Sequence, residues 1–357
     1  MNRAFRVGII GADTKASWAQ LSHVPAINAL ADVELAAVAT RHEDSARAAA
    51  EAFGARRWYA DPPALIEDDD IDIVTVAVRV PAHRSLVEAA LKAGKTVYCE
   101  APLGVDLAEV QSLQAAGEGA LTVIGLQGRL NPSVRRAAQM IADGAIGRPL
   151  TARIVSTTSG MGPATLSSYR YFDEAAAGAN LLTITAGHTL DLLEALLGEV
   201  SEVEARTPIL FPTVQVLDTR STAKREVPDH ADILGGVGDG TVFNASVIGG
   251  VAPEEAEFDF VVRGTQGWLR LRGGSLYGVQ GGDLTLTASV GFAEPDAPVV
   301  PGGGPALNVA EVYTRIAQDL RTGSRTVPDF ALATHNSTLI AAVTRAAQSG
   351  RRQRVPG

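Results

Sequence analysis

The stretch that decides the fold is IVTVAVRVPAHRSLVEAALKAGKTVYCEAPL, residues 73–103. It contains two short apolar runs without polar alternation, Ile73–Val78 and Thr96–Cys99. Continuous apolar runs of this kind are typical of strands that are buried on both faces of a parallel sheet. Between the two runs, Ala and Leu recur at helical spacing over residues 83–93. The stretch therefore predicts a strand, a crossover helix and a second, parallel strand.

The same alternation extends in both directions from this unit. Further apolar runs lie at 6–10, 35–40 and 122–126, and further helix-like segments at 45–53, 63–67 and 107–116. Asp106, followed three residues later by Glu109, predicts a capping box at the start of the last helix. Strands that alternate with helices predict an α/β fold, with an N-terminal Rossmann-type doubly wound parallel sheet over residues 1–125.

The regular alternation of apolar runs and helix-like segments ends here, and we expect a second, α+β domain over residues 126–357. Asn131-Pro132 predicts the start of a helix. The other elements expected are a long strand at 150–157, an apolar helix at 180–197, and hairpins pairing 231–234 with 242–248 and 258–263 with 268–272. Together they predict a large, mostly antiparallel open sheet. Two amphipathic helices, at 309–321 and 332–348, close the chain and are expected to pack back toward the first domain.

Composition and charge exclude several classes of partner. The net charge is −9 and no block of five Lys or Arg residues occurs, so a nucleic-acid partner is not expected. We find no run of about 18 apolar residues and no secretory leader, and therefore expect no membrane association. Cys99 is the single cysteine, so no intramolecular disulfide can form, and a cytoplasmic location fits best.

The loop after the first strand is a candidate nucleotide site. It contains Gly11-Ala12-Asp13-Thr14-Lys15, and only Gly11 of the three glycines of a dinucleotide loop is clearly in place. An ordinary strand-to-helix turn is an equal alternative for the motif alone, but its place after the first buried strand favours a nucleotide. Pyrophosphate would lie near Thr14–Trp18. The expected cofactor contacts are Gly11, Ala12, Asp13, Thr14, Lys15 and Trp18, although Lys15 also fits a solvated loop and Trp18 also fits the core.

The end of the second strand bears on the choice between NAD and NADP. An acidic residue there would bind the ribose 2′-hydroxyl, but this chain has Thr40-Arg41-His42. The Arg41 guanidinium can bind a 2′-phosphate and stack on adenine, whereas a plain surface arginine is the alternative. We therefore expect NADP, with NAD as the second possibility, and name Thr40 and Arg41 as contacts.

The order strand, Pro81-Ala82-His83, helix, Ala93-Gly94-Lys95, strand, Glu100-Ala101-Pro102 resembles the Gfo/Idh/MocA oxidoreductases. The resemblance continues through residues 144–147 and both terminal helices, so it covers nearly the whole chain. It implies a nicotinamide cofactor, a small sugar-like hydroxylated or carbonyl substrate, and a homodimer or homotetramer formed through the C-terminal sheet. It further implies cofactor contacts from Val78, Val80, His83, Glu100, Ala101 and Gln127, with helix capping as the alternative for His83.

Several segments are similar to one branch of this family, that of the yeast galactose-pathway repressor. They are residues 17–19 with 23–27, 78–81, 126–129, 187–191 and 227–230. This likeness implies a second hypothesis, a dinucleotide-binding regulator without turnover. A third is an enzyme that retains its cofactor through each cycle.

Two positions depart from the catalytic pattern of the family. Where the family has a lysine between Glu and Pro, this chain has Ala101. Where the family has an aspartate four residues before the second-domain histidine, it has Ile184. A methyl group can neither donate a proton nor carry charge, so catalysis here would need another proton donor.

The candidates for that chemistry lie in the second domain. His188 is the first, because histidine is the residue type whose usual pKa suits a proton donor near neutrality, and a structural histidine is the alternative. Asp191 lies three residues further on the same helical face, where it would orient His188 and bind substrate, with a helix-surface carboxylate as the alternative. Tyr169 or Tyr171 would replace the missing lysine, or would form a lid or part of the core. Arg129 follows the fifth apolar run, where it would bind an anionic substrate or form a salt bridge. No His or Cys spacing suggests a metal site.

Overall fold

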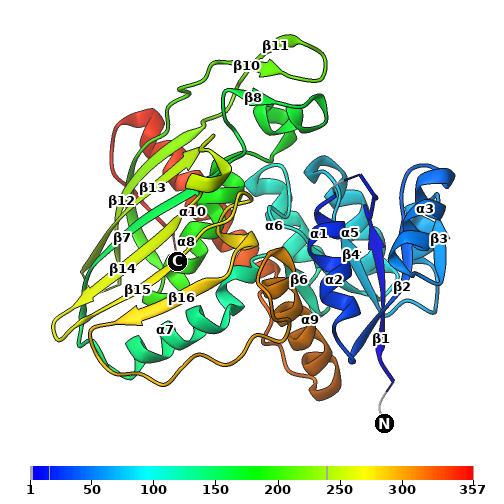
Figure 1. The fold of residues 1–357 in the computed structure, drawn as a ribbon, viewed down its shortest axis with the longest axis horizontal. Coiled ribbons are helices and arrows are strands. Elements are labelled where there is room, and N and C mark those ends of the chain that lie inside the picture. Colours follow the sequence, from blue (N-terminus) through cyan, green and yellow to red (C-terminus); the bar gives the residue numbers. More distant parts are fainter. Residues whose placement is uncertain (1–2, 16, 239, 357) are drawn as a thin grey trace. The chain divides into compact units, whose positions relative to one another are not determined.

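The structure is a computed structural model that describes residues 3–15, 17–238 and 240–356. The chain forms two compact units that interleave along the sequence (Figure 1). The first comprises Met1–Gln127 and Pro298–Thr334, and the second Gly128–Ala297 and His335–Gly357. The stretch 298–334, which the predicted division placed with the second domain, therefore belongs to the first unit.

The sheet of the first unit is parallel throughout and confirms the doubly wound prediction. Its strand order is β3 (Arg57–Tyr59), β2 (Val33–Ala39), β1 (Phe5–Ile10), β4 (Ile73–Val76), β5 (Thr96–Cys99) and β6 (Thr122–Ile124). Strand β3 was not predicted, because it has three residues at the sheet edge and none of them is buried.

The helices of the first unit follow the predicted alternation. They are α1 (Trp18–Leu21), α2 (His23–Asn28), α3 (Glu43–Phe53), α4 (Pro62–Ile66), α5 (His83–Lys92), α6 (Leu107–Ala116) and α9 (Pro305–Thr322). Asp106 accepts a hydrogen bond from the Glu109 amide at 2.9 Å, as the capping box requires. Glu109 Oε1 is buried without a hydrogen-bond partner among the described residues, so this atom does not make the reciprocal bond of a capping box.

Strand order reverses between β1 and β4, and this places the candidate cofactor residues on one edge of the sheet. Gly11 N donates to Ala39 O, Ala77 N to Ile10 O, and Gly125 N to Cys99 O. The residues that follow β1, β2, β4, β5 and β6 thus lie side by side, and we call this rim the carboxyl edge. Ligands of doubly wound sheets bind at this edge.

The second unit contains the expected open sheet of eight strands. Their order is β16 (Leu284–Ala288), β15 (Trp268–Gly273), β14 (Phe258–Gly264), β7 (Pro149–Thr158), β13 (Thr241–Gly249), β12 (His230–Val237), β9 (Val200–Arg206) and β17 (Gln353–Arg354). Both predicted hairpins, β12–β13 and β14–β15, are confirmed. The pair β7–β13 is parallel and the other pairs of this sheet are antiparallel.

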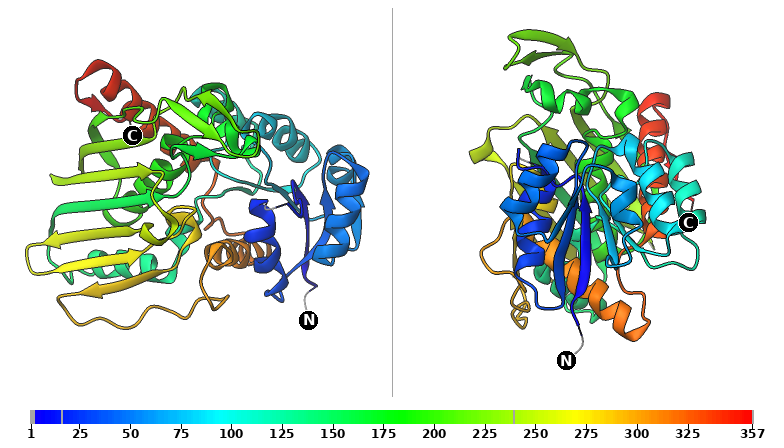
Figure 2. Two further views of the ribbon diagram at one scale, coloured as in Figure 1. Left: turned by 45° about the horizontal axis from the view of Figure 1, so that its top comes forward. Right: turned by 90° about the vertical axis from the view of Figure 1, so that its right-hand side faces the viewer.

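One face of this sheet carries the core of the second unit. Helices lie against this face of the sheet (Figure 2). The apolar side chains of the core come from α7 (Pro132–Ala142), α8 (Gly187–Leu197) and the later turns of α10 (Phe330–Ser349). Along β13, Phe243 and Ala245 are buried and Val242 and Asn244 are more accessible, as the strand period of two requires. The opposite face of the sheet is therefore partly apolar and open. None of the helices in the described part of the chain is long and apolar enough to cross a membrane.

The predicted helix over 180–197 differs from expectation at its start. Residues Leu182–Ala186 form a π-helical turn, η5, and the α-helix α8 begins only at Gly187. The Asn180 side chain accepts a hydrogen bond from the Leu182 amide at 2.9 Å and begins the turn. Single π-helical turns inside helices are frequent at functional sites, and His188 closely follows this one.

A smaller three-stranded sheet was not predicted from the sequence. It pairs β8 (Ala164–Thr165) with β10 (Thr213–Val216), and β10 with β11 (Ser221–Lys224). Its strands have two to four residues each, too few for a recognisable period.

Candidate functional site

The loop after β1 is closed around Gly11. The φ angle of Gly11 is +100°, and a Cβ atom there would lie 2.4 Å from the carbonyl oxygen of Ala77. Glycine is therefore required for the ends of β1 and β4 to meet. Val78 lies beside it, since its Cγ1 would be 2.8 Å from the same Cβ. Of the predicted contacts here, Ala12 is buried and offers only its backbone, while Lys15 is exposed.

Asp13 and Ser17 fold the loop that follows. Asp13 Oδ1 accepts from the Lys15 amide at 2.6 Å, and Ser17 Oγ donates to the Asp13 carbonyl at 2.7 Å. Ser17 also caps α1 by accepting from the Gln20 amide at 3.2 Å. Thr14 and Trp18 are half-buried in this loop and at the start of α1. The Asp13 carboxylate thus organises the loop itself.

At the end of β2, Thr40 and Arg41 have different environments. The Thr40 hydroxyl donates to the His42 carbonyl at 3.0 Å and lies 2.6 Å from Ser45 Oγ, so it fixes the turn into α3. The Arg41 side chain is exposed. An exposed guanidinium at the carboxyl edge can bind an anionic group such as a phosphate.

His83 braces two segments of the carboxyl edge. Its Nε2 lies 3.0 Å from the Val78 carbonyl and its Nδ1 3.1 Å from the Pro102 carbonyl. The ring is buried, and this burial lowers the pKa of His83, although the nearby carbonyls act in the opposite direction. Val80 is also buried. The single N–H of the neutral ring can donate to one of these carbonyls, and the ring lies between the segment that follows β4 and the segment that follows β5.

Glu100 and Gln127 follow β5 and β6 and face the same rim. Glu100 Oε1 lies 2.9 Å from Nε2 of the buried His23, and Ala101 after it begins a cis Ala101–Pro102 peptide. The Gln127 side chain is completely buried, and neither its Nε2 nor its Oε1 has a hydrogen-bond partner among the described residues. A buried amide with both ends unsatisfied costs about 1–3 kcal/mol per group, which a polar ligand would recover.

In the second unit, Asp191 and Arg129 form a close ion pair. Arg129 Nη2 lies 2.8 Å from Asp191 Oδ1, and Arg129 Nε donates to Oδ2 at 3.2 Å. Burial raises the pKa of Asp191 to about 6, although Arg129 acts to lower it. The salt bridge, which was the alternative for Arg129, is therefore present, while the Arg129 side chain stays 24% exposed.

His188 is buried in the first turn of α8, and Asp191 is buried one turn later. Further along α8, Glu194 Oε1 accepts from the Val200 amide and lies 2.9 Å from His335 Nε2. The spacing of three residues places His188 and Asp191 on neighbouring parts of one helical face, as the sequence predicted.

The predicted tyrosines lie in a 3-10 segment, η3 (Ser167–Asp173). Tyr169 is 38% exposed, and the ring centroids of Tyr171 and Phe172 are 4.1 Å apart. The buried Arg225 holds this segment by pairing with Asp173 Oδ1 at 2.7 Å and with Asp229 Oδ2 at 2.9 Å. The tyrosines are thus on a braced surface segment and outside the hydrophobic core.

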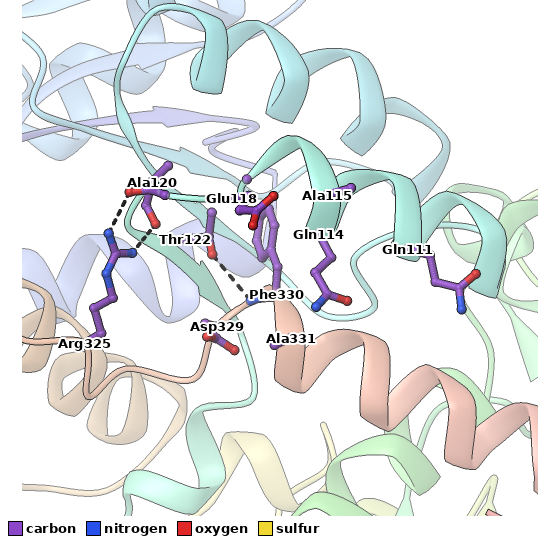
Figure 3. A pocket seen from close by; sticks show the side chains of 12 residues that line it. Gln111, Gln114, Ala115, Glu118, Ala120, Thr122, Arg325, Asp329, Phe330 and Ala331 are labelled. Atoms are coloured by element: carbon purple, nitrogen blue, oxygen red, sulfur yellow. Dashed lines mark hydrogen bonds between the residues drawn. The ribbon is translucent and has the colours of Figure 1, made fainter. Parts of the chain in front are cut away.

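A pocket of about 440 Å³ lies at the opposite, amino end of β6 (Figure 3). Gln111, Gln114 and Phe330 line it, and the Arg325 guanidinium donates to the carbonyls of Gly119 and Ala120. None of the residues predicted for the site lines this pocket. Among the described residues, no group of three or more His, Cys, Asp or Glu side chains is arranged to hold a metal ion.

Near the carboxyl edge of the first unit, three residues had no role in the sequence interpretation: His23, Gly125, and Tyr313, whose hydroxyl lies 2.9 Å from His23 Nδ1. In the second unit, Arg225 had none. His23 was noted only as part of a family-like segment, and this segment was the one available signal. Tyr313 is far from His23 in sequence, and the polar stretch around Arg225 is typical of a surface. These residues are brought into place by tertiary contacts, which a single sequence does not reveal.

A six-stranded doubly wound sheet with its switch point at Gly11 defines a protein with a Rossmann-type dinucleotide-binding unit, joined here to an α+β unit. The comparisons with known proteins agree. Residues 5–125 match the family described as "oxidoreductase family, NAD-binding Rossmann fold", and residues 132–273 match "Gal80p, C-terminal domain". The chain belongs to the Gfo/Idh/MocA oxidoreductase family, which confirms the resemblance.

Relatives in this family include both enzymes and regulators. The chain is 32% identical to dehydrogenase aclE of Aspergillus oryzae, over 77% of this chain and 79% of that protein. It is 27% identical to the galactose/lactose metabolism regulatory protein GAL80 of Saccharomyces cerevisiae, over 86% of this chain and 77% of that protein. Among solved structures, a super-repressor mutant of Gal80p from S. cerevisiae superposes with a TM-score of 0.87 at 22% identity, covering 99% and 98% of the chains. Levoglucosan dehydrogenase in complex with NADH superposes with a TM-score of 0.82 at 20% sequence identity, and the superposition covers 99% of each chain.

Proposed function

We propose that this protein is an NADP(H)-dependent oxidoreductase that moves hydride to or from a small, sugar-like hydroxylated or carbonyl compound. The observation that supports this most directly is the buried, unsatisfied amide of Gln127 at the carboxyl edge. A ligand that carries its own donor and acceptor, as the carboxamide of nicotinamide does, fits that side chain. The family match over residues 5–125 supports the same class of ligand.

We propose that the cofactor lies along the carboxyl edge. Gly11 and the loop to Trp18 would face the pyrophosphate, and Glu100 and Gln127 would face the nicotinamide half. Arg41 would bind the 2′-phosphate, for which its exposure and its place after β2 are the support. When bound, the nicotinamide supplies the hydride chemistry, and the chain supplies binding, orientation and proton handling.

We assign the proton step to the second unit, because Ala101 cannot perform it. His188 would exchange the proton with the substrate oxygen, with Tyr169 or Tyr171 as an additional donor. Arg129 and Asp191 would orient the substrate. The support for His188 is its position next to the π-helical turn and one helical turn before the ionisable pair Asp191–Arg129.

The test is to titrate the purified protein with NADP(H) and NAD(H) and then to assay hydride transfer across a panel of sugars, polyols and ketones. Arg41→Ala should weaken NADP(H) binding about tenfold, through loss of a charge-assisted hydrogen bond, and leave NAD(H) binding unchanged. Equal losses for both cofactors would contradict the assignment of Arg41. Cofactor binding without hydride exchange over the whole panel would refute the enzymatic proposal.

A regulator that binds a dinucleotide without turnover is the second candidate. Ala101 and Ile184 favour it, as does the match of residues 132–273 to the Gal80p C-terminal domain. Such a protein would bind dinucleotide and retain a protein partner on an affinity column. A substrate-dependent change in the absorbance of reduced nicotinamide would eliminate it, and isotope exchange without net absorbance change would indicate a retained cofactor.

We also propose that the protein is cytoplasmic and forms a homodimer or homotetramer through the open face of the eight-stranded sheet. Leu234 is 56% and Val242 54% exposed on that face, and the burial of such side chains would favour association. Sedimentation analysis of the purified chain, with Leu234→Glu as the variant, tests this interface. A monomeric wild-type protein would refute it.

A further inference from the structure

A chain of buried polar side chains connects the interior of the first unit to Glu100. Thr75 Oγ1 on β4 lies 2.8 Å from the Tyr313 hydroxyl on α9. The Tyr313 hydroxyl lies 2.9 Å from Nδ1 of His23 on α2, and Nε2 of His23 lies 2.9 Å from Glu100 Oε1. Each link joins two different elements, so the chain exists only because the first unit brings these elements together.

Exposure along this chain increases only at its last member. Thr75, Tyr313 and His23 are completely buried, whereas the Glu100 side chain is 13% exposed. A buried polar chain that is fully hydrogen-bonded fixes its members in place. Here the end that it fixes is a carboxyl group at the carboxyl edge, where a ligand of this sheet would bind.

The direction of the hydrogen bonds follows from the chemistry of the end groups. A carboxylate can only accept, so His23 Nε2–H donates to Glu100. With one proton on the ring, Nδ1 accepts from the Tyr313 hydroxyl, which in turn accepts from Thr75. Burial raises the pKa of Tyr313 and, together with the charge of Glu100, that of Tyr98, so both phenols keep their protons.

The imidazole is held from the sides as well. The rings of Tyr98 and Tyr313 meet it edge to face, with centroids 5.0 and 5.7 Å away. The Glu100 carboxylate also lies close to Gly125, where an added Cβ would sit 2.9 Å from Oε1 and 3.0 Å from Oε2. The carboxylate therefore occupies the space that a side chain at Gly125 would fill, and the bond to His23 together with this close fit favours a single side-chain conformation.

We propose that His23, supported by Tyr313 and Thr75, is a positioning residue that holds Glu100 as a fixed hydrogen-bond acceptor for hydroxyl groups. A ribose hydroxyl of the dinucleotide is one source of such donors, and a hydroxylated substrate is the other. This inference rests on the proposed function for the identity of the ligand. The position of Glu100 itself can be tested without any ligand.

The test measures the dissociation constants of NADP+ and NADPH by calorimetry in the absence of substrate. His23→Leu should weaken binding about tenfold, because a charge-assisted hydrogen bond is misplaced, whereas His23→Gln, which retains an N–H donor, should recover part of the loss. Glu100→Gln should weaken binding at least as much. The double variant should bind no worse than Glu100→Gln alone, since His23 acts through Glu100.

His335→Leu is the matched control, because it breaks a second His–Glu pair with the same 2.9 Å separation in the other unit. It should leave cofactor binding unchanged. Additive losses for His23→Leu and Glu100→Gln would overturn the positioning role. If the variants bind the dinucleotide normally and only the KM of a hydroxylated substrate rises, the donor is the substrate hydroxyl and not the ribose.

A crystal structure of His23→Leu separates this inference from the proposed function. It should show the Glu100 carboxylate displaced from Gly125, and an unchanged carboxylate would overturn the positioning role. Failure of the wild-type protein to bind either dinucleotide would instead refute the proposed function, whatever the position of Glu100.

Discussion

The two units each contain a His–Glu pair at 2.9 Å, and the pairs are built in opposite senses. In the pair His23–Glu100, the histidine is completely buried and the carboxylate is 13% exposed. In the pair His335–Glu194, the carboxylate is 5% and the histidine 17% exposed. Glu194 also accepts the Val200 amide, so it secures the turn between α8 and β9. The same two residue types therefore present a carboxylate outward in one unit and stabilise a turn in the other.

This difference shows that residue type and distance do not define a role. What distinguishes the pairs is which member reaches the surface and which backbone groups are already bound. Glu100 has no backbone amide to satisfy within the described structure and lies at the carboxyl edge, while Glu194 is occupied by its own chain. Three substitutions sharpen the comparison.

Glu194→Ala should have the largest effect, and the effect should be on stability alone. It leaves the Val200 amide and the His335 imidazole without their acceptor, which should lower the free energy of unfolding by about 2–3 kcal/mol. Chemical denaturation measures this loss, and calorimetry should show unchanged dinucleotide affinity. A loss of affinity in a protein that remains folded would mean that the second pair also serves the ligand.

Gly125→Ala should have the second-largest effect, and it should be mainly on dinucleotide affinity. The new methyl group would occupy the space of the Glu100 carboxylate, since its carbon would lie 2.9 Å from Oε1, too close for the carboxylate to stay in place. We expect dinucleotide binding to weaken about tenfold, which corresponds to about 1.4 kcal/mol of binding free energy. The melting temperature should change less than it does in Glu194→Ala. Gly128→Ala, where the nearest atom would be an ordinary 3.4 Å away, is the matched control. Equal affinity in the two variants would contradict the assignment of Gly125.

His335→Gln should have the smallest effect, and it should depend on pH. The hydrogen bond that His335 donates to the Glu194 carboxylate raises the pKa of His335, against a smaller opposing effect of burial. Because the folded-state pKa is raised, the stabilisation is fully present below about pH 6.5 and is lost as the pH rises through the folded-state value. Denaturation at about pH 5.5 and about pH 8.5 should show wild type more stable than the variant only at the lower pH, by less than about 1 kcal/mol. A difference that is the same at both values would contradict this assignment.

Much of the fold could be predicted because the relevant signals are local. Continuous apolar runs identified β1, β2, β4, β5 and β6, and Asp106 marked the residue that caps α6. Strand β3 and the small sheet were missed, since two to four residues are too few to show a period. The π-helical turn before His188 was also missed, because the apolar sequence continues from Leu182 into α8 without a break.

Candidate site residues could be placed from the sequence only where they are tied to strand ends. Gly11, Arg41, Glu100 and Gln127 follow strands, so the sequence alone placed them on one rim of a doubly wound sheet. The role of Arg129 was left open between substrate binding and a salt bridge, and the fold pairs it with Asp191.

By itself, the sequence determined the parallel sheet, the glycine at its switch point, the membership of an oxidoreductase family and the absence of the usual lysine at Ala101. These properties depend on periodicity and on residues that are near one another in the chain. Only the tertiary structure decided that Thr75, Tyr313 and His23 form a hydrogen-bonded chain that ends at Glu100, across sequence separations of up to 290 residues. Burial and hydrogen-bond direction depend on such distant contacts, and these decide in which of the two His–Glu pairs the carboxylate is the more exposed member.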